Sequence, residues 1–96
     1  MNKDKIIDIL HQFKELNREK YNISKIGLFG SAVRGEMHER SDVDIVVEMT
    51  KPDMFSLIGI KQDLEKKLNM PVDVVRYRDK MNKFLKGRIE KEAVYV

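Results

Sequence analysis

Residues 30–47 read GSAVRGEMHERSDVDIVV, and most of the expected structure follows from them. The stretch joins a glycine–serine turn, which follows an apolar run, to two aspartates that open a second apolar run. Because alternate residues of a strand point to the same face, Asp42 and Asp44 would lie on one face, roughly 7 Å apart along the chain. Carboxylates this close repel each other unless a cation lies between them, and Mg²⁺ or Mn²⁺ favours such oxygen ligands. The pattern predicts a divalent-cation site; the simpler alternative is that Asp42 only caps or terminates a strand.

The turn at Gly30 and Ser31 has the features of a phosphate-binding segment. Glycine lets the backbone come close to a ligand, and Ser31 supplies a hydroxyl and an N–H at the start of a short helix over residues 32–34. In such a helix Arg34 would lie on the same side as Ser31 and could contact the same phosphate. The alternative for Ser31 is an ordinary helix N-cap.

Hydrophobic periodicity predicts the elements around this stretch. A first amphipathic helix is expected between Lys3 and about Tyr21, covering one face of a sheet, with its apolar residues at Ile6, Ile7, Leu10, Phe13 and Leu16. Strands are expected over residues 25–29, 42–48 and 72–77. A helix capped by Asp53 should precede the third strand, and a helix over 80–91 with a short extended tail should close the chain.

The expected topology brings the polar residues together. A connection that contains a helix joins the second and third strands, which is the form of a parallel crossover. Parallel pairing would bring Asp42, Asp44 and Asp73 to one edge of the sheet. Antiparallel pairing of the first two strands would place Gly30 and Ser31 at that edge too. Along the second strand, the residues expected to face the core are Val43, Ile45 and Val47, with Asp42, Asp44 and Val46 on the other face.

Composition limits the class of protein. Ninety-six residues with 42% apolar and 36% charged side chains predict one folded domain over residues 1–96, and the absence of cysteine excludes disulfides and thiolate metal sites. No apolar run approaches the ~18 residues that span a bilayer, so we expect a cytoplasmic protein without a membrane segment. Residues 76–96 carry seven basic and three acidic side chains. A solvated helix face is favoured there over a phosphate-binding or acidic-partner surface, because no aromatic residues are interleaved.

Three carboxylates beside a phosphate-binding turn fit two-metal phosphoryl or nucleotidyl transfer. One ion would hold the triphosphate and stabilise the leaving pyrophosphate, while the second would lower the pKa of an attacking hydroxyl. Asp42 and Asp44 would bridge both ions. Asp73 would complete the ion nearer the acceptor and help to take its proton.

These residues also carry a family resemblance. Gly30-Ser31, ten residues, Asp42-Val43-Asp44 and a later Asp73 together resemble the signature of the DNA polymerase β-type nucleotidyltransferase superfamily. Residues 30–36 and 41–45 resemble its minimal nucleotidyltransferase branch, including the MntA-type antitoxins, and the similarity runs from Ile26 through Glu92-Ala93-Val94.

The resemblance implies an α/β (α+β) nucleotidyltransferase fold, a small mixed β-sheet with helices packed on it. It implies Mg²⁺-dependent transfer of AMP from ATP, and in the MntA-type branch the acceptor is a tyrosine of a partner HEPN-domain toxin. Asp42, Asp44 and Asp73 match the metal and catalytic positions, and the turn at Gly30 and Ser31 matches the nucleotide site. Arg34 and Arg40 could each contact a phosphate, and each could equally be a surface residue without such a contact.

Besides a protein adenylyltransferase antitoxin, two other functions remain as alternatives. One is a catalytically silent antitoxin that neutralises its partner by contact alone, and the other is a catalytic subunit that modifies a small-molecule hydroxyl. Because the catalytic core uses nearly the whole chain, we expect another molecule or subunit to hold the acceptor. Exposed apolar surface should then form the interface of an oligomer or hetero-complex.

Overall fold

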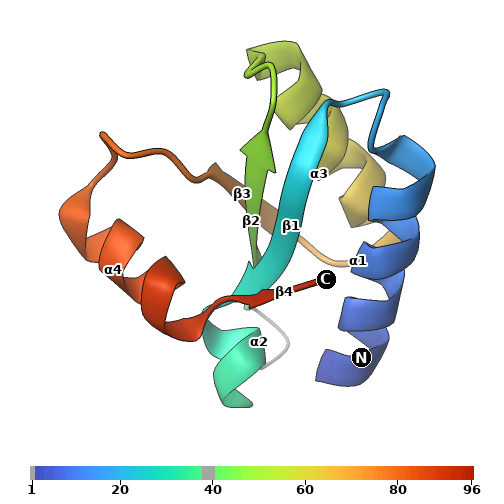
Figure 1. Cartoon of the computed structure of the whole chain (residues 1–96). Helices are drawn as coiled ribbons and strands as arrows, with labels where there is room; N and C mark the ends of the chain where they lie inside the picture. Colours follow the sequence, from blue (N-terminus) through green and yellow to red (C-terminus); the bar gives the residue numbers. More distant parts are fainter. Residues whose placement is uncertain (1, 38–40) are drawn as a thin grey trace.

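The structure is a computed structural model that describes residues 2–37 and 41–96 (Figure 1). A mixed sheet lies at the centre of the molecule, with helices on both of its faces. In chain order the elements are α1 (Lys3–Asn17), β1 (Ile23–Phe29), α2 (Ser31–Arg34), β2 (Val43–Met49), α3 (Met54–Leu68), β3 (Val72–Arg76), α4 (Lys83–Glu92) and β4 (Val94–Tyr95).

The strand order is β3-β2-β1-β4. β1 and β2 are antiparallel, and β2 and β3 are parallel across the α3 crossover, so both predicted pairings are confirmed. The expected extended tail is also present, but it does more than the sequence indicated. Its residues form β4, which pairs antiparallel with the end of β1, opposite Gly27 and Leu28.

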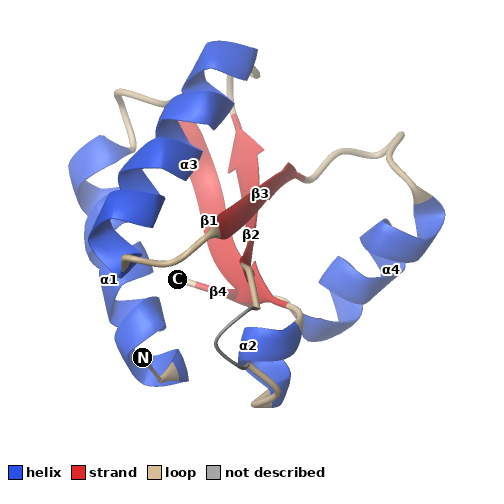
Figure 2. Ribbon diagram, turned by 180° about the vertical axis from the view of Figure 1, so that it is seen from behind, coloured by secondary structure: helices blue, strands red, loops and turns tan. Residues whose placement is uncertain are grey.

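The two faces of the sheet carry separate cores (Figures 1 and 2). α1 and α3 cover one face, where Val43, Ile45 and Val47 are fully buried among their side chains. α4 covers part of the other face, where Phe29, Val46 and Ile89 form a smaller cluster. The alternation along β2 therefore agrees with the prediction, and it leaves Asp44 on the α4 face, in line with Val46.

Element ends follow local capping. Asp53 caps α3 through a hydrogen bond from the amide of Phe55, as expected, and Asn69 ends that helix in the left-handed conformation. α4 begins at Lys83, three residues later than predicted, because Asn82 accepts hydrogen bonds from the first amides of the helix. Leu16 was predicted to belong to the apolar face of the first helix that covers the sheet. This prediction was wrong, since the side chain is 75% exposed near the end of α1. Within the described residues, none of the helices is long and apolar enough to cross a bilayer.

Candidate active site

Asp44 and Asp73 lie side by side on β2 and β3. They are register partners in the parallel pair, so both side chains project from the same face of the sheet, the face that α4 partly covers. Asp44 is half-buried and Asp73 is exposed. The two carboxylates predicted from separate segments are therefore adjacent, and the pair opens to solvent.

Asp42 is less closely associated with this pair. It precedes the first residue of β2 and is exposed. Within residues 2–37 and 41–96, no three carboxylate or imidazole side chains are grouped closely enough to hold a metal ion by themselves. The protein thus presents an adjacent pair of aspartates with a third nearby. Divalent cations bound to nucleotides commonly use one or two carboxylates together with phosphate oxygens, so this donor set fits Mg²⁺ carried with a triphosphate.

The electrostatics at Asp44 also fit a cation. Burial raises the pKa of Asp44, the neighbouring Asp73 raises it further, and Asp42 adds to the effect. Arg88 of α4 and, more weakly, Arg34 act in the opposite direction. The ionised carboxylate is therefore disfavoured when no cation is bound, and a divalent cation would gain from an unneutralised negative site.

Gly30 is required by its close approach to Asp44. The residue has φ of 76°, a conformation that favours glycine, and Phe29 just before it is the register partner of Asp44. A Cβ atom at position 30 would overlap the Asp44 carboxylate. The predicted turn is thus placed directly against one of the predicted acids, and Ser31 begins the short helix α2 beside it.

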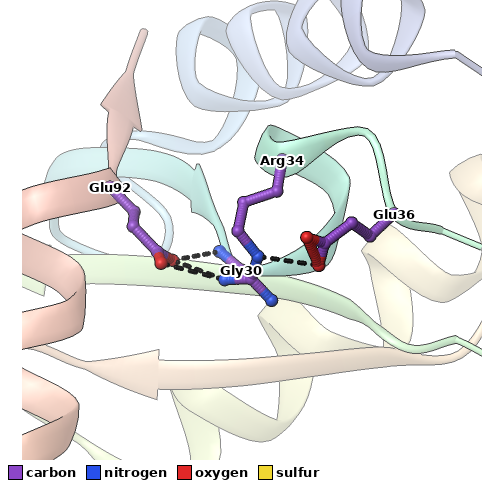
Figure 3. Close-up of polar contacts among 4 residues, drawn as sticks. All are labelled: Gly30, Arg34, Glu36 and Glu92. Carbon is purple, nitrogen blue, oxygen red and sulfur yellow. Dashed lines mark hydrogen bonds and ion pairs between the residues drawn. The ribbon is translucent and has the colours of Figure 1, made fainter.

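Arg34 is engaged by carboxylates (Figure 3). Its Nη1 donates to both oxygens of Glu92, at 2.9 and 3.0 Å, and its Nε donates to Glu36 at 3.0 Å. The amide of Gly30 also donates to Glu92, at 3.3 Å. These hydrogen bonds, first to Glu36 and then to Glu92, raise the pKa of Arg34. The two carboxylates would therefore compete with a phosphate for this guanidinium. Arg40 lies outside the described residues.

Sequence reasoning missed the two α4 residues that border the site. Glu92 contacts the turn, and Arg88 lies over the ring of Phe29 with its guanidinium carbon 6.0 Å from the ring centre. Arg88 was assigned to a solvated helix face, and Glu92 was given no role at the site. Pairing of β4 with β1 brings the end of α4 to the turn, and a two-residue strand gives too weak a sequence pattern to predict that pairing.

The chain resembles known proteins in sequence over nearly its whole length. A model of the nucleotidyltransferase domain family matches residues 10–96. The chain belongs to this family. It is 40% identical over 98 residues to the protein adenylyltransferase MntA of Thermococcus cleftensis, covering 97% of this chain and 94% of that protein.

Solved structures agree with the family. One is a toxin–antitoxin structure with AMP-PNP, which has a TM-score of 0.73 to this chain at 28% sequence identity. The matched region covers 99% of this chain and 72% of the solved chain. Another, a candidate minimal nucleotidyltransferase, has a TM-score of 0.81 at 25% identity and covers 98% of this chain and 95% of its own. The chain is thus a nucleotidyltransferase with the mixed α/β fold that the sequence predicted.

Proposed function

We propose that this nucleotidyltransferase moves AMP from ATP to a tyrosine hydroxyl of a partner protein, the HEPN-type toxin of a toxin–antitoxin pair. The observation that carries the proposal is the pairing of Asp44 with Asp73 on one face, against the Gly30 turn. Support for the acceptor class comes from the MntA relative, which is named a protein adenylyltransferase, and from the toxin–antitoxin structure with AMP-PNP.

The residues would divide the reaction as follows. Ser31 and the turn hold the triphosphate, and Arg34 contacts one of its phosphates. The tyrosine oxygen forms a bond to the α-phosphorus while the bond to the bridging oxygen of pyrophosphate breaks. Asp73, the more exposed acid, receives the hydroxyl proton, and Asp44 would hold a cation that positions the donor phosphate.

Asp42, Asp44 and Asp73 are the side chains that would hold Mg²⁺, and we propose two ions. When bound, Mg²⁺ supplies charge neutralisation of the triphosphate and eases deprotonation of the hydroxyl. The raised pKa of Asp44 supports this assignment, since adjacent acids without a cation are unfavourable.

Label transfer tests the proposal. The chain is incubated with α-labelled ATP, Mg²⁺ and the protein product of the neighbouring reading frame, and label on that protein is followed with time. We expect Asp44→Asn and Asp73→Asn to lower transfer about 100- to 1,000-fold, the cost typical of removing one electrostatic group from an active site. Asp8→Asn is the matched control, because Asp8 is an exposed acid on α1, the helix that covers the opposite face.

Two outcomes would contradict the proposal. Neutralisation of the partner without label, unchanged in Asp44→Asn, would assign the chain to antitoxins that act by contact alone. Efficient labelling of a free small-molecule hydroxyl, with none on the partner, would make it the catalytic subunit of a small-molecule enzyme.

A further inference from the structure

β3 is an open edge of the sheet. It pairs with β2 on one side, and Figure 2 shows it with no strand beside it on the other, between α3 and α4. The amide of Tyr77 donates to Val47 and the carbonyl of Pro71 accepts from Val43, so odd-numbered residues of this segment face β2. Because the direction alternates along a strand, the N–H and C=O groups of Val74 and Arg76 point away from the sheet.

The two ends of this edge are closed by side chains, whereas its middle is not. The amide of Val72 donates to Glu65 at 3.1 Å, and the amide of Arg78 donates to the sulfur of Met81 at 3.5 Å. Among the described residues, no acceptor is recorded for the amides of Val74 and Arg76. The open segment therefore has the length of one short added strand, and edge strands of this kind are templates for pairing with another chain.

A cavity of about 390 Å³ lies along the open segment. Its apolar lining includes Leu57 of α3 and Leu85 of α4, and Arg76 and Arg78 add positive charge. Val74 and Val75, although they belong to the two cores, are only half-buried here. An occupant of this surface would need a backbone in extended form, apolar side chains and acidic groups.

We propose that the occupant is an extended segment of the acceptor protein that adds to β3 as a further strand and carries the tyrosine to be modified. This inference rests on the proposed function and describes how its protein acceptor is held. Acidic side chains of the segment would face Arg76 and Arg78.

The spacing connects the open edge to the active site. Neighbouring strands lie about 4.8 Å apart, and side chains of residues opposite each other lie on the same face of a sheet. A tyrosine opposite Asp73 would therefore project from the same face as Asp73 and Asp44. Arg76 lies three residues further along β3, roughly 10 Å away at about 3.3 Å per residue. We therefore expect an acidic residue three positions from the modified tyrosine, on the opposite face of the added strand.

Amide exchange measured by NMR tests the added strand directly. The probe is a nine-residue peptide with a central tyrosine, glutamate three positions to either side and valine elsewhere, added to the isotope-labelled chain with Mg²⁺ and AMP-PNP. Exchange should slow at the amides of Val74 and Arg76 and change little at Val75, whose amide already faces β2. Unchanged exchange at Val74 and Arg76, up to the solubility limit of the peptide, would overturn the inference.

Charge reversal gives a second test that does not depend on the backbone. Arg76→Glu combined with Arg78→Glu should weaken peptide binding about fivefold or more, and a peptide with lysine in place of glutamate should recover it. Lys61→Glu is the matched control, because Lys61 is exposed on α3 and does not line the cavity. Equal loss in this control, or no recovery by the lysine peptide, would contradict the charge complementarity.

Val74→Pro removes an outward N–H without removing a β2–β3 hydrogen bond, and it should abolish the slowed exchange at Arg76.

Sedimentation of the chain alone tests whether a second copy of the chain occupies the edge instead. A dimer that Val74→Pro dissociates would assign β3 to that second copy and overturn the inference. Labelling of the partner protein together with unchanged exchange at the edge would leave the proposed function intact. Failure of AMP-PNP to bind would instead count against the proposed function.

Discussion

At Asp44 the requirements of folding and of chemistry oppose each other. Burial and the adjacent Asp73 raise the pKa of this carboxyl, so the folded chain retains the proton at pH values where the unfolded chain, with a pKa near 3.8, has lost it. The folded state binds more protons in that interval, and the free energy of unfolding therefore decreases as the pH rises through it. A bound divalent cation would remove this penalty.

Asp44→Asn should accordingly stabilise the metal-free protein at pH 7 while slowing transfer about 100- to 1,000-fold. The midpoint of thermal unfolding, measured in chelator, should be higher for the variant. The difference should shrink as the pH falls below the raised pKa of the folded state, and it should vanish below about 3.8, where Asp44 is neutral in both the folded and the unfolded chain. Added Mg²⁺ should raise the midpoint of the wild type more than that of the variant. A variant that is less stable than the wild type at pH 7 in chelator would contradict this interpretation.

Glu92 also influences the electrostatics of the site. Its carboxylate accepts from the Nη1 of Arg34, and that of Glu36 accepts from the Nε, so two negative charges flank a guanidinium proposed to contact phosphate. Glu92→Gln removes one of these charges and should tighten binding of AMP-PNP with Mg²⁺ about two- to fivefold, as measured by calorimetry. Glu90→Gln, which removes a charge from the same helix at a residue bonded to Tyr77, should leave binding unchanged. Weaker binding in Glu92→Gln would instead make Glu92 a residue that positions Arg34.

Among the elements, the two helices that contain glycine differ in why it is there. A Cβ atom at Gly59 of α3 would lie 2.8 Å from the ring of Tyr21, whose hydroxyl donates to Asp63 at 2.6 Å. Gly87 of α4 has open space around it. By propensity alone, both glycines weaken their helices, and only the packing around each distinguishes the two positions.

Substitution by alanine should therefore act in opposite directions at these two sites. Gly87→Ala should raise the free energy of unfolding by up to about 1 kcal/mol, the helix-propensity gain. Gly59→Ala should lower it by about 1–3 kcal/mol, because the added methyl displaces Tyr21. Urea unfolding of both variants measures the difference, and stabilisation by Gly59→Ala would show that the Tyr21 ring moves aside at little cost.

The elements also explain what the sequence could predict. Alternation along β2 and the helical crossover placed Asp44 and Asp73 correctly, because the strand periodicity lies close to each aspartate and the helix between the two strands predicts parallel pairing. The contact of Glu92 with Arg34 was not predictable, since it joins residues 58 positions apart through the short strand β4. Leu16 follows the apolar spacing of α1, yet the helix ends one residue later and no element covers it.

For the whole molecule, the two faces of the sheet have different tasks. α1 and α3 bury the main core on one face, whereas α4 covers only part of the other and leaves Asp73 exposed. The large side chains of Phe55 and Phe84, in the first turns of α3 and α4, are exposed. This arrangement fits a site completed by a second protein.

In the mechanism proposed above, the Asp44–Asp73 pair performs nucleotidyl transfer while other surfaces hold the partner. The most direct measurement is single-turnover AMP transfer by Asp73→Asn, with binding of the partner protein and of AMP-PNP measured on the same preparation. We predict that the variant binds the partner as the wild type does and transfers AMP at least about 100-fold more slowly. Transfer at the wild-type rate by a variant that binds both ligands normally would contradict the claim.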